Sequence, residues 1–478
     1  MTLDIGYRLA ALLIPLASLV VSCHAVLTKR DSRSALTWVA LAWFAPVVGV
    51  LLYLLFGINR LRRRVTLQSR ETPHWEHGEA ATCDLATLEQ RLERRHRHLV
   101  TLASAVNRLT ERPLLDGNTV EVLVDGDEAF PAMIEAIHQA RISITLATYI
   151  FGNDRIGRAF ADALTAAVRR GVAVRVLIDN AGERYTWPSM VGVLRRRGVV
   201  VARFFPSLPS RLFGINMRNH RKLLVIDGRI GFTGGMNIRR HHSREESGRR
   251  MARDFQFRLQ GPVVQQLQEV FYEDWYFAAR ERLDGQLWFP PCRRRGEVVA
   301  RGIRSGPDDN FLKHQDVLLA AIATAERSLR IVTPYFLPES TLISALTTAA
   351  LRGIRIDIVL PESSNLPFVH WAMMAQLPQI MDHDIQVWLS PPPFDHAKAM
   401  IVDEVWSFIG SSNWDPRSLR LNFEFNVECY DPSLASVLTA HVDQRIRAAR
   451  LLNLEELEDR AFPVRLRDGL TRLLMPYL

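Results

Sequence analysis

The feature that most constrains the fold is a duplicated stretch of sequence. Residues 219–237 read NHRKLLVIDGRIGFTGGMN, and residues 396–413 read HAKAMIVDEVWSFIGSSN. Both stretches carry His, Lys, Asp, Phe, Gly and Asn at the same relative positions. Two unrelated surface features would not match at all of these positions. The chain is therefore predicted to contain an internal repeat.

Strand-like and helix-like segments alternate around both copies in the same order. The first half has strand candidates at 120–125, 142–151 and 172–180, separated by helix candidates at 129–140 and 156–171. The second half repeats this order ahead of its own copy of the motif. Such alternation is typical of α/β folds with a mainly parallel sheet. We therefore expect an α/β fold of two pseudo-symmetric units, packed as one body around a pseudo-two-fold axis.

The repeat also sets the expected domain boundaries. The segment before the first unit mixes Arg and Glu at helical spacing, which predicts a polar helix that is either solvated or lies on anionic headgroups. The sequence PPCRRRGEVVARG breaks the pattern between the units. The expected divisions are an amino-terminal segment at 1–60, a polar helical linker at 61–115, the first unit at 116–285, a connector at 286–305 and the second unit at 306–478.

Two apolar segments near the amino terminus are long enough to cross a membrane. Residues 9–27 and 35–58 carry no formally charged side chain, and each has the roughly 20 residues that span a bilayer. Joined by the short link TKRDSRS, they predict an all-α transmembrane hairpin. A cleaved signal peptide ending near Cys23 is the alternative for the first segment. Arg8 and the arginine cluster at 60–64 outnumber the basic residues of the link, which favours a cytoplasmic body.

Charge and cysteine content narrow the classes of function. The formal charge of +9 and a pI near 9.7 indicate an anionic partner, either nucleic acid or a membrane surface. No CxxC pair occurs among the four cysteines, so neither a zinc site nor a disulfide framework is expected.

The spacing within each copy predicts which side chains act together. Side chains on a strand alternate between its faces, so His220 and Lys222 point the same way, whereas Asp227 has the opposite parity and lies in an Asp-Gly turn. Parity therefore favours a framework role over proton transfer for the two aspartates of the motif. The candidate catalytic set is His220, Lys222, Asp227, His396, Lys398 and Asp403.

The partner strands of the two hairpins return towards the histidines and bring Asn237 and Asn413 with them. Two histidines, two lysines and two asparagines would form a cationic pocket that suits the nonbridging oxygens of a phosphate. One imidazole can attack phosphorus while the other protonates the leaving oxygen. This scheme needs no metal and no cofactor.

The duplicated pattern HxKx4Dx6G[GS]xN resembles that of the phospholipase D superfamily, and the likeness covers nearly the whole chain after residue 115. The segments NMRNHRKLLVIDGRIGFTGGMNI, TPYFLP and DPRSLRLNFEFNVE are similar to those of the bacterial cardiolipin synthases within that superfamily. The two apolar amino-terminal segments are similar to theirs as well.

The resemblance implies a role for each motif residue. It makes His220 the nucleophile that forms a phosphohistidine and His396 the general acid and then base, with the reverse order left open. It implies acidic partners for the far nitrogens of the two imidazoles, at the matching positions Asp254 and Glu424. Gly235 stands where the second copy has a serine hydroxyl. The residues implied to hold the phosphate are Lys222, Lys398, Asn237, Asn413 and Ser411.

The resemblance also implies a reaction: phosphatidyl transfer between two phosphatidylglycerol molecules, which yields cardiolipin and glycerol. The implied partners are phosphatidylglycerol, other anionic phospholipids and the bilayer, with no nucleic acid. The implied location is the bacterial inner membrane, crossed more than once, with a cytoplasmic catalytic body. A phosphatidyl hydrolase, a related phosphatidyltransferase and a nuclease of the same superfamily are the alternatives. The oligomeric state is left open.

Overall fold

The computed structural model of this 478-residue chain describes residues 2–29, 32–57, 81–110, 112–204, 217–306, 312–473 and 475. The chain divides into two compact units. The first comprises residues 1–70 and 207–216, and the second comprises residues 71–206 and 217–478. Both copies of the motif lie in the second unit, which is called the body below.

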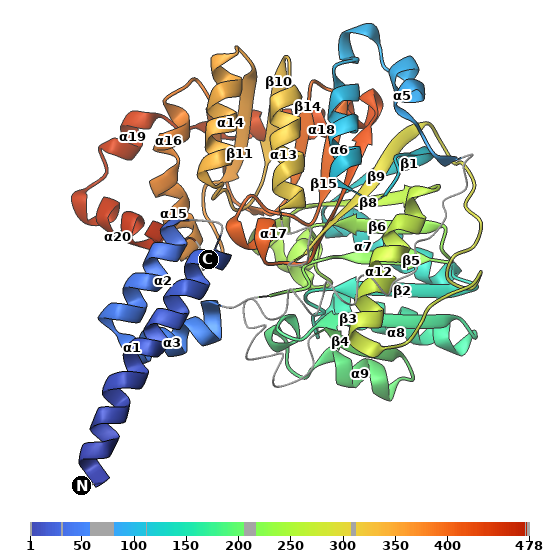
Figure 1. Ribbon diagram of the computed structural model, residues 1–478. Coiled ribbons are helices and arrows are strands. Elements are labelled where there is room, and N and C mark those ends of the chain that lie inside the picture. Colours follow the sequence, from blue (N-terminus) through green and yellow to red (C-terminus); the bar gives the residue numbers. More distant parts are fainter. Residues whose placement is uncertain are drawn as a thin grey trace. The chain divides into compact units, whose positions relative to one another are not determined.

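The first predicted membrane segment forms one long helix, α1 (Thr2–Thr28), and its stretch Ala11–Thr28 is long and apolar enough to cross a membrane. The next helix, α2 (Ser32–Phe44), lies alongside it (Figure 1). Ser18 Oγ donates to the carbonyl of Ala42 over 2.6 Å, a contact that small residues permit because they let helices approach closely.

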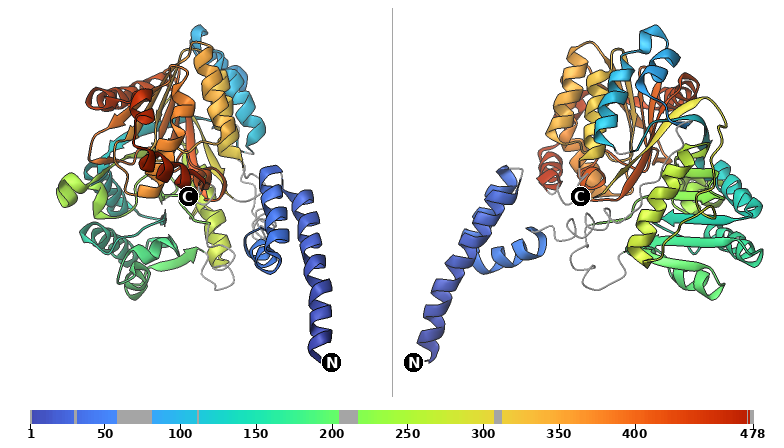
Figure 2. Two further views of the ribbon diagram at one scale, coloured as in Figure 1. Left: turned by 90° about the vertical axis from the view of Figure 1, so that its left-hand side faces the viewer. Right: turned by 45° about the vertical axis from the view of Figure 1, so that its right-hand side comes forward.

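The second predicted segment is not one continuous helix. After α2 come α3 (Pro46–Leu52) and a π-helical turn (Tyr53–Gly57). The break falls at Ala45 (φ −135°), because the ring of Pro46 disfavours helical backbone in the residue before it. With 13 residues α2 is about 20 Å long, short of the ~30 Å hydrocarbon core. The expectation of one spanning helix over residues 35–58 is therefore wrong, and Figure 2 shows α3 turning away from α2.

The body is built on a continuous sheet, to which fifteen strands of the described residues contribute. The strands of the first half are β1 (Leu115–Val124), β2 (Ser143–Thr148), β3 (Ala173–Asp179), β4 (Val200–Phe204), β5 (Leu223–Ile226), β6 (Ile230–Gly234) and β8 (Phe255–Gln260). Those of the second half are β9 (Val298–Ser305), β10 (Ser328–Val332), β11 (Arg355–Pro361), β12 (Gln386–Ser390), β14 (Ala399–Val402), β15 (Trp406–Gly410), β16 (Glu424–Tyr430) and β17 (Arg450–Leu451).

The strand order confirms the internal repeat. From the centre outward the first half runs β1-β8-β6-β5-β2-β3-β4, and the second runs β9-β16-β15-β14-β10-β11-β12 with β17 at its edge. Antiparallel pairing of β1 with β9 joins the halves. Only the β2-β3-β4 and β10-β11-β12 ladders are parallel, so the expectation of a mainly parallel sheet is wrong. The HxK hairpins and the strands that follow them add antiparallel ladders, because a tight turn can join only antiparallel strands.

Helices pack against this sheet (Figure 1). Helix α12 lies across β2, β4, β5 and β9, and α18 lies across β10, β11, β12, β14 and β15. Each half has its own apolar core, one around Phe130, Phe160 and Leu164 and the other around Leu318, Leu346 and Trp406. The longer helices are α7 (Asp125–Gln139), α8 (Arg155–Arg169), α9 (Met190–Arg196), α12 (Val263–Ala279), α13 (Lys313–Thr324), α14 (Ser340–Leu351), α15 (Pro367–Gln376), α18 (Pro432–Ala448) and α20 (Phe462–Leu473). Shorter ones are α11 (Arg244–Ser247), α16 (Pro378–Met381), α17 (Pro416–Arg420), α19 (Leu454–Glu458) and the single 3₁₀ turns η4 (Gly182–Tyr185), η5 (Arg240–His242) and η6 (Gly248–Arg250).

The expectations for the polar linker and for the connector between the two halves both need correction. Residues 61–80 of the predicted linker lie outside the described residues, and the remainder forms α5 (Leu85–Arg91), η3 (Arg94–His96) and α6 (Leu99–Leu109). The solvated-helix interpretation is wrong for α6, whose apolar side chains recur at helical spacing and are buried against α13. The predicted connector 286–305 contains β9, so the second half begins at Val298 rather than at residue 306.

Candidate active site

Each copy of the motif folds as a hairpin, β5-β6 in the first half and β14-β15 in the second. At the first turn Asp227 and Gly228 both have positive φ angles, 52° and 61°. Turns of this kind match the right-handed twist of the two strands that they join. The hairpin therefore returns towards the histidine end and places the Gly-Gly or Gly-Ser pair and the asparagine beside it.

The two motif aspartates tie the hairpin turns to the backbone at the start of the neighbouring strands β2 and β10, and they do not bond the motif histidines. The carboxylate of Asp227 accepts hydrogen bonds from the N–H groups of residues 141, 142 and 143, at 2.7 to 3.2 Å. Asp403 does the same for residues 326, 327 and 328 at 2.8 to 2.9 Å, and its Oδ2 lies 2.7 Å from Nε2 of His98. Grouping these aspartates with the catalytic residues is therefore wrong, and their place in the fold is the framework one that strand parity favours.

At the site, short segments of one half pair with short segments of the other half. Asn219 forms a parallel bridge with Phe423, and β13 (Phe394–Asp395) pairs in parallel with β7 (Ala252–Arg253). The N–H of His220 donates to Phe423 O (2.9 Å), and the N–H of His396 donates to Arg253 O (2.7 Å). Each histidine is thus held beside the residue that precedes an acidic residue of the other half.

This exchange pairs each imidazole with a carboxylate from the opposite half. Nδ1 of His220 lies 3.0 and 3.1 Å from the two oxygens of Glu424, and Nδ1 of His396 lies 2.7 Å from Oδ2 of Asp254. Both carboxylates are completely buried. A carboxylate at Nδ1 selects the tautomer and orientation of the ring and leaves Nε2 for chemistry.

The two histidine–carboxylate pairs, His220 with Glu424 and His396 with Asp254, are called the dyads below. Their charges affect one another's pKa values. Burial lowers the pKa of His220, although Glu424 opposes this. Burial also lowers the pKa of His396, with the help of the charges of Lys398, Lys222 and His220. Burial raises the pKa of Asp254. Burial would also raise the pKa of Glu424, but His220, Lys222 and Ser411 together hold that pKa below its usual value.

The two motif lysines are buried beside the histidines. Lys222 Nζ donates to the carbonyl of His220 (2.6 Å), and Lys398 Nζ donates to the carbonyl of His396 and lies 2.9 Å from its Nδ1. Burial lowers the pKa of Lys222 to about 7 and that of Lys398 to about 8. A dianionic or monoanionic phosphate between them would offset this desolvation and restore the charged form.

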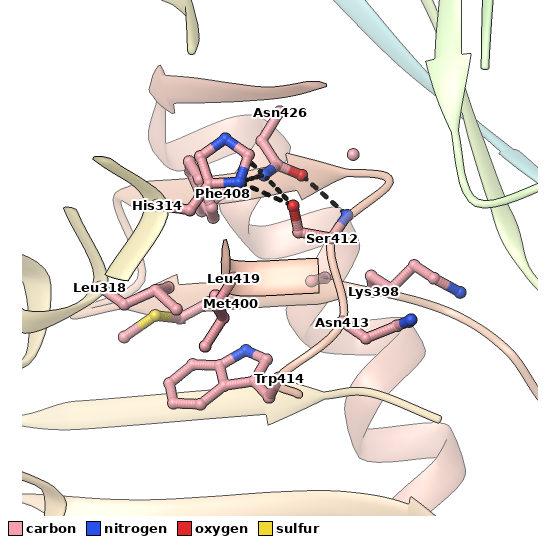
Figure 3. Close-up of a pocket in the computed structure, with 12 residues that line it drawn as sticks. His314, Leu318, Lys398, Met400, Phe408, Ser412, Asn413, Trp414, Leu419 and Asn426 are labelled. Atoms are coloured by element: carbon pink, nitrogen blue, oxygen red, sulfur yellow. Dashed lines mark hydrogen bonds between the residues drawn. The ribbon is translucent and has the colours of Figure 1, made fainter. Parts of the chain in front are cut away.

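The residues after each hairpin differ in what they bond. Oδ1 of Asn237 accepts from the N–H of Ile150 (3.1 Å), which leaves its Nδ2 amide as a donor. Nδ2 of Asn413 donates to Ser418 Oγ (3.2 Å), and its buried Oδ1 has no hydrogen-bond partner among the described residues. Figure 3 shows the ends of Lys398 and Asn413 directed to the same side.

Ser411 has a different place from the one implied by the resemblance. Its hydroxyl donates to Glu424 Oε2 (2.5 Å) and accepts from the N–H of Phe425 (3.0 Å), so it orients the carboxylate partner of His220. At Gly235, its counterpart, an added Cβ would lie 2.5 Å from both carboxylate oxygens of Asp254. The departure from Gly-Ser in the first copy thus has a steric reason.

Three residues outside the duplicated motif also border the site. The ring of Tyr149 lies 5.4 Å from that of His220, and the ring of Tyr335 lies 6.4 Å from that of His396, at the ends of the equivalent strands β2 and β10. Buried His314 lies within hydrogen-bonding distance of Ser412 and Asn426, and Figure 3 shows its ring beside these two side chains. It opens an ordinary amphipathic helix, so no sequence signal marks it.

His242, Asp254 and His396 form the one group of described side chains whose ligand atoms, all within 4.8 Å of one another, could hold a metal ion. The fit is poor, because both nitrogens of His242 are already engaged. Nε2 accepts from the N–H of Asn237 (3.3 Å), and Nδ1 lies 3.3 Å from the carbonyl of Ala252. Burial lowers the pKa of His242 to about 3, which keeps the ring neutral.

Comparison with known proteins supplies the wider context. The family described as "Cardiolipin synthase, PLD-like domain" matches residues 133–275 and 318–446, and the one described as "Phospholipase_D-nuclease N-terminal" matches residues 16–57. The major cardiolipin synthase ClsA of Bacillus subtilis (strain 168) is 32% identical over 470 residues, which cover 94% of this chain and 95% of that one. Cardiolipin synthase A of Pseudomonas putida (strain GB-1) is 31% identical over 475 residues, 99% of this chain and 98% of that one.

Among solved structures, phosphatidylserine synthase from Haemophilus influenzae Rd KW20 matches with a TM-score of 0.62 at 16% identity. The match covers 79% of this chain and 100% of that chain, which shows a shared fold. Together the comparisons confirm the resemblance that the duplicated motif predicted.

Proposed function

The chain belongs to the cardiolipin synthase family with a phospholipase D-like domain, and from this premise we propose that it joins two phosphatidylglycerol molecules into cardiolipin and glycerol through a phosphohistidine intermediate. In the first step the bond between phosphorus and the glycerol oxygen of the donor breaks, and a bond from phosphorus to an imidazole nitrogen forms. In the second step a hydroxyl of the acceptor lipid attacks phosphorus, and the bond to nitrogen breaks.

This proposal rests mainly on the two dyads. In each of them, a buried carboxylate from one half holds Nδ1 of an imidazole from the other half. Nε2 of His220 attacks the phosphodiester. His396 gives a proton to the departing glycerol and then takes one from the incoming hydroxyl. The charges of Lys222 and Lys398 and the amides of Asn237 and Asn413 stabilise the phosphate oxygens.

One observation favours the reverse order of the histidines. A nucleophile must be neutral, and the charges of Lys398, Lys222 and His220 help to lower the pKa of His396, whereas Glu424 raises the pKa of His220. Rapid acid-free quenching of the His396→Ala variant, followed by peptide mass spectrometry, separates the two orders. A phosphatidyl group on the peptide that contains His220 supports the order given above. The reverse order is supported if the His220→Ala variant carries the phosphatidyl group on its His396 peptide while the His396→Ala variant carries none on its His220 peptide.

We further propose that the protein works at the bacterial inner membrane with its body on the cytoplasmic side. Helix α1 would cross the bilayer, and α2 with α3 would return the chain. The body offers a second contact in α20, where Phe462, Leu466, Leu470 and Leu473 are 49 to 74% exposed at intervals of three or four residues. With the exposed Arg465 on the same helix, such a stripe suits the headgroup region of anionic lipid.

Incubation of the purified full-length protein in phosphatidylglycerol bilayers tests the reaction. The expected products are cardiolipin and glycerol, identified by mass spectrometry and lost in His220→Ala and in His396→Ala. Arg169→Gln, which removes an exposed charge from the far end of α8, is the matched control. Phosphatidic acid as the sole lipid product would make the protein a hydrolase with water as acceptor.

A further inference from the structure

A groove of about 810 Å³ lies on the first half of the body, outside the pair of dyads. It is formed by the start of α8, the turn that contains η4 and the residues that follow Asn237. Its lining is rich in arginine and has two aromatic residues at its edge, of which Tyr185 is 67% and Trp187 is 92% exposed. The arginines are Arg155, Arg158, Arg239 and Arg240.

This groove adjoins the catalytic residues on two sides. Arg239 follows Asn237 by two residues, and Ile150, which lines the groove, donates its N–H to Asn237 Oδ1. The Tyr185 ring lies 6.1 Å from that of Tyr149, which in turn contacts His220. The charge of Arg239 also contributes to the low pKa of His396. A molecule in the groove would therefore lie next to the phosphate position.

The acidic residues of the lining are already engaged. Asp154 accepts from the N–H groups of Gly157 and Arg240, Asp162 forms an ion pair with Arg197, and Glu246 pairs with Arg155 at 2.5 Å. Arg239 bonds the ring of His241, and neither it nor Arg240 has a carboxylate within ion-pair distance in the part of the chain that the structure describes. The carboxylate of Asp154 acts on Arg239 only through space, so both guanidinium groups are available to pair with a phosphate.

The transfer reaction needs a second anion-binding position. The donor phosphate occupies the space between the histidines, while the acceptor carries its own phosphodiester a few bonds from the attacking hydroxyl. Water and neutral alcohols lack this anion. Binding energy taken from a remote group of the substrate can be used to orient the reacting hydroxyl. Guanidinium groups suit the task, because they pair with two oxygens of one phosphate.

We propose that the groove binds the phosphodiester headgroup of the acceptor lipid through Arg239 and Arg240, and so selects an anionic alcohol over neutral alcohols and water. This inference rests on the proposed transfer reaction. Tyr185 and Trp187 lie where the acceptor enters, and aromatic side chains with one polar atom suit the boundary between headgroups and acyl chains.

The test compares two water-soluble acceptors. Full-length protein in mixed micelles receives labelled phosphatidylglycerol as donor and either glycerophosphoglycerol, which is the acceptor headgroup with its phosphodiester, or glycerol, which is neutral. The measured quantity is the ratio of kcat/KM for the anionic to that for the neutral acceptor. Wild type should favour glycerophosphoglycerol. Arg239→Gln should lower this ratio by about tenfold, the effect of one charge-assisted hydrogen bond, mainly through KM.

The double variant with Arg240→Gln should lower the ratio further, Arg239→Lys should recover part of it, and Arg169→Gln should leave it at the wild-type value. An equal fall for both acceptors would mean that Arg239 acts only through His396 and would overturn the proposal. So would an unchanged ratio. Both of these results presuppose wild-type protein that makes cardiolipin, whereas its failure to do so would overturn the proposed function itself.

Discussion

Removing the carboxylate of Glu424 tests whether each catalytic histidine is paired with a carboxylate from the other half. In Glu424→Gln the side chain keeps its shape, but Nδ1 of His220 loses two contacts to a buried anion at 3.0 and 3.1 Å. Two unit charges about 3 Å apart interact by roughly 5 kcal/mol at an effective dielectric constant of 20, which is an upper limit here because Lys222 shares the same carboxylate. A charge-assisted hydrogen bond contributes about 1.5–3 kcal/mol. We therefore expect a fall in kcat of about 10- to 150-fold.

The sign of the accompanying pKa change follows from the same contacts. Glu424 raises the pKa of His220 against the effect of burial, so its loss should lower that pKa further. Titration of the two imidazoles by NMR in Glu424→Gln should show His220 losing its proton at lower pH than in wild type, with His396 little changed. The thermal midpoint serves as the control for folding. A shift confined to His396, or a loss of activity below tenfold with an unshifted His220, would refute the exchanged pairing.

Four further outcomes are expected from other contacts. Asp227→Ala should lower the free energy of unfolding by about 1–3 kcal/mol, because three backbone N–H groups lose their acceptor, as denaturant titration would show. Gly235→Ala should reduce kcat by at least about tenfold with little change in melting temperature, because the new methyl group displaces Asp254; wild-type turnover would contradict the steric argument. Because burial lowers the pKa of Lys222 to about 7, the lysine loses its charge as pH rises through that value, so KM should rise above pH 7 in wild type and stay flatter in Lys222→Arg. Leu470→Glu on the exposed face of α20 should weaken activity on phosphatidylglycerol vesicles severalfold and leave activity in detergent micelles intact, and equal losses in both would argue against a lipid contact.

The spacing within each copy of the motif predicted the local geometry of its histidine, lysine and turn. The i, i+2 spacing of His and Lys and the Asp-Gly turn depend only on the geometry of a strand and a hairpin, and the structure has both. Strand parity also separates Asp227 from His220, although membership of the repeated motif groups it with the catalytic residues. Its three backbone partners come from residues 141–143, a contact over more than 80 positions that no local pattern reveals.

Errors in element boundaries have equally physical causes. Residues 35–58 read as one apolar segment because hydropathy does not register that Pro46 interrupts the helix at Ala45. The segment PPCRRRGEVVARG breaks the alternating pattern and so predicts a connector, yet β9 begins within it, and Arg301 of β9 is fully buried and pairs with buried Glu428. The polar residues of α6 predict a solvated helix, but its apolar residues form one face that packs against α13.

The sequence by itself determined the repeat, the two hairpins and the residue types of the candidate site, because these depend on spacing within short segments. The tertiary structure decided which carboxylate serves which histidine: β7-β13 and the Asn219–Phe423 bridge cross between halves, so that Asp254 meets His396 and Glu424 meets His220. Two equivalent copies are compatible with pairing within a half or across halves. Only the packing of one half against the other distinguishes these arrangements, and that packing depends on contacts far apart in the chain.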